Sequence, residues 1–211
     1  MSIYSYLQEY RHGTEIENDR QSGPLEQESD EESPLMFHMV NEKHGEFCQW
    51  YPSTFFVYKH EILEAVGQDR KEGDGYGTVW FSSAEQFMMY SKATRFGDHE
   101  TQRRVMKTKD PKEQKRLGRQ TAGFTHAGWD EVKSAVVELA NTAKFGQNAG
   151  LRTKLLATGD RLLCEAAPDD RVWGIGFDAK RAMAMQDRWG ENRLGKALMA
   201  VREKLRKEVV D

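Results

Sequence analysis

The clearest periodic pattern in this chain is a run of apolar residues spaced three or four positions apart between residues 130 and 146. These positions are Val132, Ala135, Val136, Leu139, Ala140 and Ala143. The spacing places them on one face of an α-helix, whereas a half-buried strand would need alternation of period two. We expect this helix to begin at Asp130, whose carboxylate suits an N-cap, and to end at Gly146.

Four more segments carry helix signals of the same kind. Their predicted bounds are about 83–96, 111–118 (or 123), 148–158 and 194–205. Ser82 or Ser83 can cap the first of these helices, and proline stands at the first helical position of the second. Most of the regular structure is therefore expected to be helical.

Short β-prone runs supply the rest. Residues 55–58 and 78–80 flank a glycine-rich turn at 73–77, which predicts a hairpin. Residues 162–166 and 172–177 also predict short strands. We expect an α+β fold that is mainly α, built as a single compact helical domain with a small β-hairpin or short sheet.

The start of the chain differs in composition from the remainder. Between residues 15 and 33, Asp and Glu are frequent and apolar side chains are almost absent. Such a segment cannot offset the entropy cost of ordering by burial. We interpret residues 1–34 as a disordered acidic tail, either inert or partner-binding, and residues 35–211 as the folded domain.

Bulk properties exclude several classes of protein. The net charge of −3 argues against a protein that coats DNA with a broad cationic face. No apolar run approaches the roughly 20 residues that span a bilayer, and the first ten residues lack a secretory signal pattern. Two distant cysteines, Cys48 and Cys164, suggest a reducing compartment. We expect an intracellular, cytoplasmic protein without a membrane partner, and leave a nuclear location and the oligomeric state open.

Common cofactor motifs are absent from the sequence. The six histidines and two cysteines show no metal-ligand spacing. There is no glycine-rich dinucleotide or P-loop motif, and no Gly-x-Ser-x-Gly elbow. We therefore expect neither a metal nor a cofactor, which leaves acid–base chemistry combined with aromatic stacking.

The segment from Glu165 to Met199 has the strongest pattern of a ligand site. Trp173 lies between a charged turn and the glycines at 174 and 176, where a flat ligand could stack and approach the backbone. The alternative is a buried strand that ends at Trp173, with the glycines allowing close packing. The local pattern favours neither interpretation.

Glu85 is the first candidate for chemistry. It lies seven positions before Lys92, which is two helical turns, so both side chains can project from one face. Ser82 and Glu85 also match a capping box, in which the glutamate satisfies a backbone N–H at the start of the helix. From these residues alone, the cap is the favoured interpretation.

Trp129, Asp130 and Asn148 are further candidates. Asp130 and Asn148 each occupy a position that suits an N-cap, and Trp129 can act as a hydrophobic staple. In the functional alternative, Trp129 stacks on a base or sugar, Asp130 handles a proton or hydroxyls, and Asn148 contacts ribose and phosphate. Each signal is weak alone, but their order along the chain is informative.

Taken in order, these blocks resemble the YbiA-like, or NADAR (NAD and ADP-ribose associated), family. The matching blocks lie at residues 83–98, 110–119, 129–130, 141–148, 155–160, 173–176 and 190–195. Together they cover nearly everything from residue 47 to residue 205. The chain departs from the usual family pattern at Cys48-Gln49-Trp50-Tyr51-Pro52 and at Ala167, and such differences near a site's rim affect substrate choice.

The resemblance implies a compact, mainly helical N-glycosidase domain at residues 35–211. By position, the implied catalytic residues are Glu85, Lys92 and Asp130. The implied ligand-binding residues are Trp50, Tyr51, Arg119, Trp129, Asn148, Arg171, Trp173, Gly174, Gly176 and Asn192. Glu85 would be the key carboxylate, and Lys92 would either hold phosphate and tune Glu85 or attack C1 of the ribose.

Three functions stay open under this resemblance. The first is an ADP-ribosyl glycohydrolase that removes ADP-ribose from a modified nucleobase, such as guanine in DNA. The second is an N-glycosidase of phosphoribosylated intermediates of riboflavin synthesis. The third is a non-enzymatic ADP-ribose-binding module. The expected partners are accordingly ADP-ribose or a ribosyl phosphate, and in the first case ADP-ribosylated nucleic acid.

Overall fold

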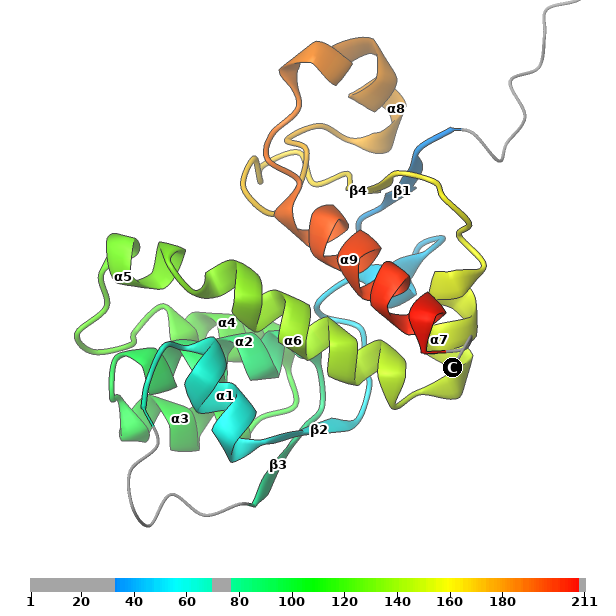
Figure 1. Cartoon of the computed structure of the whole chain (residues 1–211). Helices are drawn as coiled ribbons and strands as arrows, with labels where there is room; N and C mark the ends of the chain where they lie inside the picture. The colour runs from blue at the N-terminus through cyan, green and yellow to red at the C-terminus, as the bar shows by residue number, and fades with distance from the viewer. Residues whose placement is uncertain (1–32, 70–76, 209–211) are drawn as a thin grey trace, which may run out of the picture.

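The computed structural model of the chain describes residues 33–69 and 77–208 (Figure 1). The expected acidic tail up to residue 32 and the turn at 73–76 lie outside these residues. In chain order the elements are β1 (Leu35–Phe37), η1 (Gly45–Phe47), β2 (Phe55–Tyr58), α1 (Lys59–Ala65), β3 (Thr78–Phe81), α2 (Ala84–Arg95), α3 (His99–Met106), α4 (Pro111–Gly118), α5 (His126–Asp130), α6 (Lys133–Gly146), α7 (Ala149–Leu156), β4 (Leu163–Glu165), α8 (Ala179–Ala182), η2 (Met183–Arg188) and α9 (Arg193–Lys207). The expected α+β fold, mainly α with little sheet, is confirmed.

Helix α6 occupies the middle of the molecule (Figure 1). It packs against α2 on one side and against α9 on the other. The predicted helical face is confirmed at Val136 and Ala140, which are buried. It is wrong at Ala135, which is exposed, and the buried face extends instead to Val137 and Phe145. The same face also buries two polar side chains, Asn141 and Lys144.

The strands form two separate pairs. Strands β2 and β3 pair antiparallel, with Phe55 opposite Phe81, which confirms the predicted pairing. The connection is not a simple hairpin turn, because helix α1 lies between the two strands. Strands β1 and β4 pair parallel, with Phe37 opposite Glu165. This second pair brings residues from the two ends of the domain together and fixes the backbone at Glu165.

Two local predictions are wrong. Residues 172–177 form a loop because their backbone groups bond elsewhere: the N–H groups of Val172 and Trp173 donate to the Asp170 carboxylate. Asp130 does not cap α6. Thr125 caps a short helix, α5, that ends at Asp130, and α6 begins three residues later.

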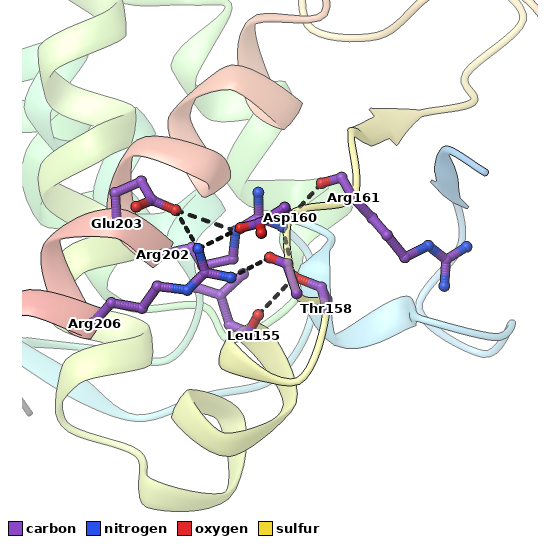
Figure 2. A network of polar contacts seen from close by, with 8 residues as sticks. Leu155, Thr158, Asp160, Arg161, Arg202, Glu203 and Arg206 are labelled. Carbon is purple, nitrogen blue, oxygen red and sulfur yellow. Dashed lines mark hydrogen bonds and ion pairs between the residues drawn. The ribbon is translucent and has the colours of Figure 1, made fainter. Parts of the chain in front are cut away.

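The C-terminal part of α9 is fastened to the turn between α7 and β4 by a polar network (Figure 2). Buried Arg202 donates from Nη1 to Thr158 Oγ1 at 2.8 Å and to the Arg161 carbonyl oxygen at 2.9 Å. Closer to the surface, Arg206 pairs with Asp160 at 2.6 Å. A buried guanidinium with these partners stabilises the turn that leads into β4.

We expect Arg202→Met to lower the free energy of unfolding by about 2–3 kcal/mol, because the hydrogen bonds that it removes involve a charged donor in a buried site. Chemical denaturation with guanidinium chloride measures this change. Lys204→Met, on the exposed side of the same helix, is the matched control and should shift stability by no more than about 0.5 kcal/mol. Equal effects of the two variants would contradict a stabilising role for the Arg202 contacts.

Candidate active site

A cavity of about 590 Å³ is lined by side chains from segments that lie far apart in the sequence. This volume lies within the range of small-molecule sites. Its lining residues are His38, Met39, Val40, Cys48, Gln49, Trp50, Glu85, Met88, Met89, Lys115, Arg119, Glu165, Ala167, Pro168, Asp169, Asp170 and Trp173. Three buried lining atoms, His38 Nδ1, Gln49 Nε2 and Glu165 Oε2, have no hydrogen-bond partner among the described residues. Unpaired buried polar atoms are costly, so they mark positions where a ligand can bond.

Glu85 lies in the first turn of α2, and its side chain faces the cavity instead of capping the helix. Ser83 is the N-cap and accepts from the Gln86 backbone N–H at 3.1 Å. The Gln86 side chain in turn accepts from the Ser82 backbone N–H at 2.7 Å. The cap interpretation of Glu85 is therefore wrong, because the neighbouring glutamine takes that role and leaves the carboxylate free for the cavity.

Burial dominates the electrostatics of Glu85. The side chain is only 5% exposed, and burial raises the pKa of its carboxyl to about 7. Lys115, the indole N–H of Trp50, Arg119 and Lys92 each act to lower this pKa. The balance leaves a carboxyl that changes charge near neutral pH, as acid–base catalysts require.

Glu165 brings a second buried glutamate to the same cavity, and no sequence pattern predicted a role for it. It is the last residue of β4, and burial, Asp170 and Glu85 raise its pKa, which reaches about 7 although Lys115 acts in the opposite direction. Its position at the end of a short buried strand, just before the charged turn, was the available signal. The sequence also did not single out Gln49 or Lys115.

Two cations at the end of α4, one in its last turn and one at its C-cap, line the same cavity as these acids. Lys115 and Arg119 are one helical turn apart, and both line the cavity. Lys115 Nζ lies 5.7 Å from the centroid of the Trp50 ring. Among the described residues neither cation forms an ion pair within 4.0 Å, so both can serve an anionic ligand.

Four of the expected site residues meet in the cavity: Glu85, Trp50, Arg119 and Trp173. Others form the framework behind it. A Cβ on Gly174 would lie 2.7 Å from the Glu165 carbonyl oxygen, and Gly176 has a left-handed φ of 79°. Three more expected residues bond to the backbone of other segments. Arg171 donates to the Arg188 carbonyl oxygen, and Asn148 donates to the carbonyl oxygens of Thr54 and Lys144. Asn192 bonds to the backbone of β4.

The remaining expected residues lie outside the cavity lining. Trp129 is 8% exposed and belongs to the hydrophobic core. Asp130 is exposed and pairs with Lys133 and Arg193. Tyr51 lies under Lys144, whose Nζ is 5.5 Å from the ring centroid, and Lys92 Nζ lies 4.0 Å from the centroid of the Phe124 ring.

Within residues 33–69 and 77–208, no three or more His, Cys, Asp or Glu side chains gather in a way that could hold a metal ion. None of the helices in this part of the chain is long and apolar enough to cross a membrane. Both cysteines are free and buried. The chemistry that this site offers is that of two buried glutamates, two aspartates from the adjoining turn, two cations and aromatic rings.

Comparison with known proteins agrees with this picture. The NADAR domain model matches residues 36–206. The chain is 36% identical over 174 residues to N-glycosidase R617 of Acanthamoeba polyphaga mimivirus, which covers 80% of this chain and 94% of that protein. It is 34% identical over 129 residues to N-glycosidase YbiA of Escherichia coli K12, covering 61% of this chain and 72% of that protein.

A longer relative and a solved structure extend the comparison. Riboflavin biosynthesis protein VVA0006 of Vibrio vulnificus is 31% identical over 174 residues, which cover 82% of this chain but only 39% of that protein. The NMR structure of E. coli YbiA superposes with a TM-score of 0.62 at 25% identity, covering 85% of this chain and 89% of that one. This chain thus shares its fold with E. coli YbiA.

We expect Trp50→Phe to raise the pKa of Glu85 above about 7, because the substitution removes an indole N–H that stabilises the ionised carboxylate. A pH titration of the protein followed by NMR of ¹³C-labelled glutamate carboxyls measures this shift. Trp80→Phe, at an exposed tryptophan outside the cavity, should leave the titration unchanged. An unchanged or lowered pKa in Trp50→Phe would contradict the assigned hydrogen bond.

Proposed function

Because this chain belongs to the NADAR domain family, we propose that it hydrolyses the bond between ribose C1 and a nitrogen atom of its substrate. The observation that carries this proposal is the buried Glu85 carboxyl on the wall of a cavity that also holds Trp50 and the cations Lys115 and Arg119. The relatives named N-glycosidases support it.

The residues suit the charge that develops during this reaction. As the C–N bond breaks, positive charge builds on C1, and an ionised carboxylate nearby stabilises it. Lys115, Arg119 and the Trp50 N–H keep part of the Glu85 population ionised despite its burial. Trp50 and Trp173 provide aromatic surface against which a base or sugar can stack.

For the substrate we propose ADP-ribose attached to a nucleobase, such as guanine in DNA. Lys115 and Arg119 are one turn apart, so together they suit a ligand with two adjacent phosphates better than a ligand with a single phosphate. The second candidate is a phosphoribosylated intermediate of riboflavin synthesis, favoured by the similarity to the riboflavin biosynthesis protein of Vibrio vulnificus. A non-enzymatic ADP-ribose reader is the weaker alternative, because it would have no use for a buried carboxyl that titrates near pH 7.

We expect the protein to release ADP-ribose from ADP-ribosylated single-stranded DNA faster than it releases ribose phosphate from the riboflavin intermediate. Chromatography of the released sugars measures both rates. Glu85→Gln should lower turnover by about 10²-fold or more while circular dichroism shows an unchanged fold. A faster reaction with the riboflavin intermediate would select the second candidate, and wild-type turnover in Glu85→Gln would reject the catalytic role.

The Lys92 position favours a supporting role over a covalent one. Its ammonium lies against the Phe124 ring, and it is not among the residues that line the cavity. Burial and Arg119 lower its pKa, while its own charge favours the ionised form of Glu85.

We therefore expect no Lys92 adduct when borohydride is added during turnover, as judged by mass spectrometry of tryptic peptides. A reduced sugar adduct on Lys92, absent from Lys92→Arg, would establish the covalent route instead.

A further inference from the structure

The cavity holds a second carboxyl for which hydrolysis has a clear use. Glu165 reaches the cavity from β4, on the opposite part of the chain from Glu85 on α2. Its Oε2 atom is buried and has no hydrogen-bond partner among the described residues. Glu165 lines the cavity, and an unpartnered buried carboxyl oxygen on a lining residue marks a place where a polar partner is missing.

The geometry points to Glu165 as the general acid that protonates the leaving nitrogen, while Glu85 acts as the ionised carboxylate beside ribose C1. This inference rests on the proposed N-glycosidase function. The C1–N bond breaks, its electron pair stays on the nitrogen, and the Glu165 proton is transferred to that nitrogen. Water then adds to C1 and gives a proton to the Glu165 carboxylate, which restores the acid.

The charges around the two carboxyls assign the roles. Glu85 is flanked by Lys115, Arg119 and Lys92 and accepts a hydrogen bond from Trp50. Glu165 faces Asp170 from its own turn, Glu85 from α2 and Lys115 from α4, and the cavity also brings His38 and Cys48 near it. More positive charge surrounds Glu85, so the pair favours a state in which Glu85 is ionised and Glu165 holds the proton.

The backbone of Glu165 is held on both sides. Its N–H donates to Asn192 Oδ1 at 3.1 Å, and its carbonyl oxygen accepts from the Ile175 N–H at 2.9 Å. The Asn192 side chain also donates from Nδ2 to the Leu163 carbonyl oxygen at 2.8 Å. Asn192 is therefore a positioning residue that ties β4 to the start of α9, and a general acid needs such fixed placement.

A comparison of leaving groups tests the assignment. One substrate carries an ordinary heterocyclic base, whose nitrogen must be protonated to leave, and the other carries a pyridinium, which departs as a neutral base without a proton. Glu165→Gln should lower kcat by about 10²–10⁴-fold for the first substrate. For the pyridinium substrate the loss should stay below about 10-fold, whereas Glu85→Gln should impair both.

The pH profile gives a second readout that a structural role would not move. The acid acts only while Glu165 is protonated, so wild-type kcat should fall as pH rises through its pKa of about 7. This alkaline limb should disappear in Glu165→Gln and persist in Glu165→Asp, which keeps a carboxyl. Glu138→Gln, at an exposed position on α6 outside the cavity, should behave as wild type.

Other results would contradict either the general-acid role of Glu165 or the N-glycosidase function itself. Equal losses in Glu165→Gln for both leaving groups, or an alkaline limb that survives this substitution, would overturn the general-acid role while leaving the N-glycosidase proposal intact. If the wild-type protein cleaves neither substrate, the proposed function itself fails, and the role of Glu165 in it fails with it.

Discussion

The arrangement of the site depends on the hydrogen bonds that a fully buried lysine on α6 makes to the segment around η1. Lys144 has no exposed surface and donates from Nζ to the carbonyl oxygens of Glu46 at 2.7 Å and Cys48 at 2.9 Å. Burial lowers its pKa to about 7, although Cys48 and Glu46 act to raise it. A donor placed so deep must keep its partners, so it fixes the loop after η1 against the central helix.

The loop after η1 carries the residues that bond to Glu85. The Gln49 carbonyl oxygen accepts from the Glu85 backbone N–H at 3.0 Å, and Asn141, one turn before Lys144 on α6, donates to the Gln49 side chain at 3.2 Å. Trp50 follows directly and bonds to the Glu85 carboxyl. On the other side of α6, helix α9 holds β4 and Glu165 through Asn192 at its start and through Arg202 near its end. The two acids thus reach one cavity from two independently anchored parts of the chain.

The sequence predicts the elements better than the site. Caps and apolar spacing are local, so the serines at 82–83 and the proline at 111 mark the starts of α2 and α4 correctly. The β1–β4 pair joins residues about 130 positions apart, and the sequence around Leu35–Phe37 has no pattern that predicts a strand. Glu165 could not be assigned for the same reason, because its role depends on a neighbour, Glu85, that only the fold supplies. Trp129 shows the converse: a cap-adjacent tryptophan looks like a ligand contact or a staple, and the fold buries it in the core.

Placing two carboxyls in one buried cavity works against stability. A carboxyl whose pKa is raised on folding binds its proton more tightly in the folded state, so its contribution is favourable at low pH and is lost as pH rises toward about 7. Ionising both acids at once would be more costly still, because Asp170 adds a third negative charge next to Glu165. Lys115 lies near enough to lower the pKa of both, and a phosphate bound there would withdraw part of that compensation. Bound anionic substrate would therefore disfavour the state in which both acids are ionised and favour the state in which the pair keeps one proton, which Glu165 can donate to the leaving base.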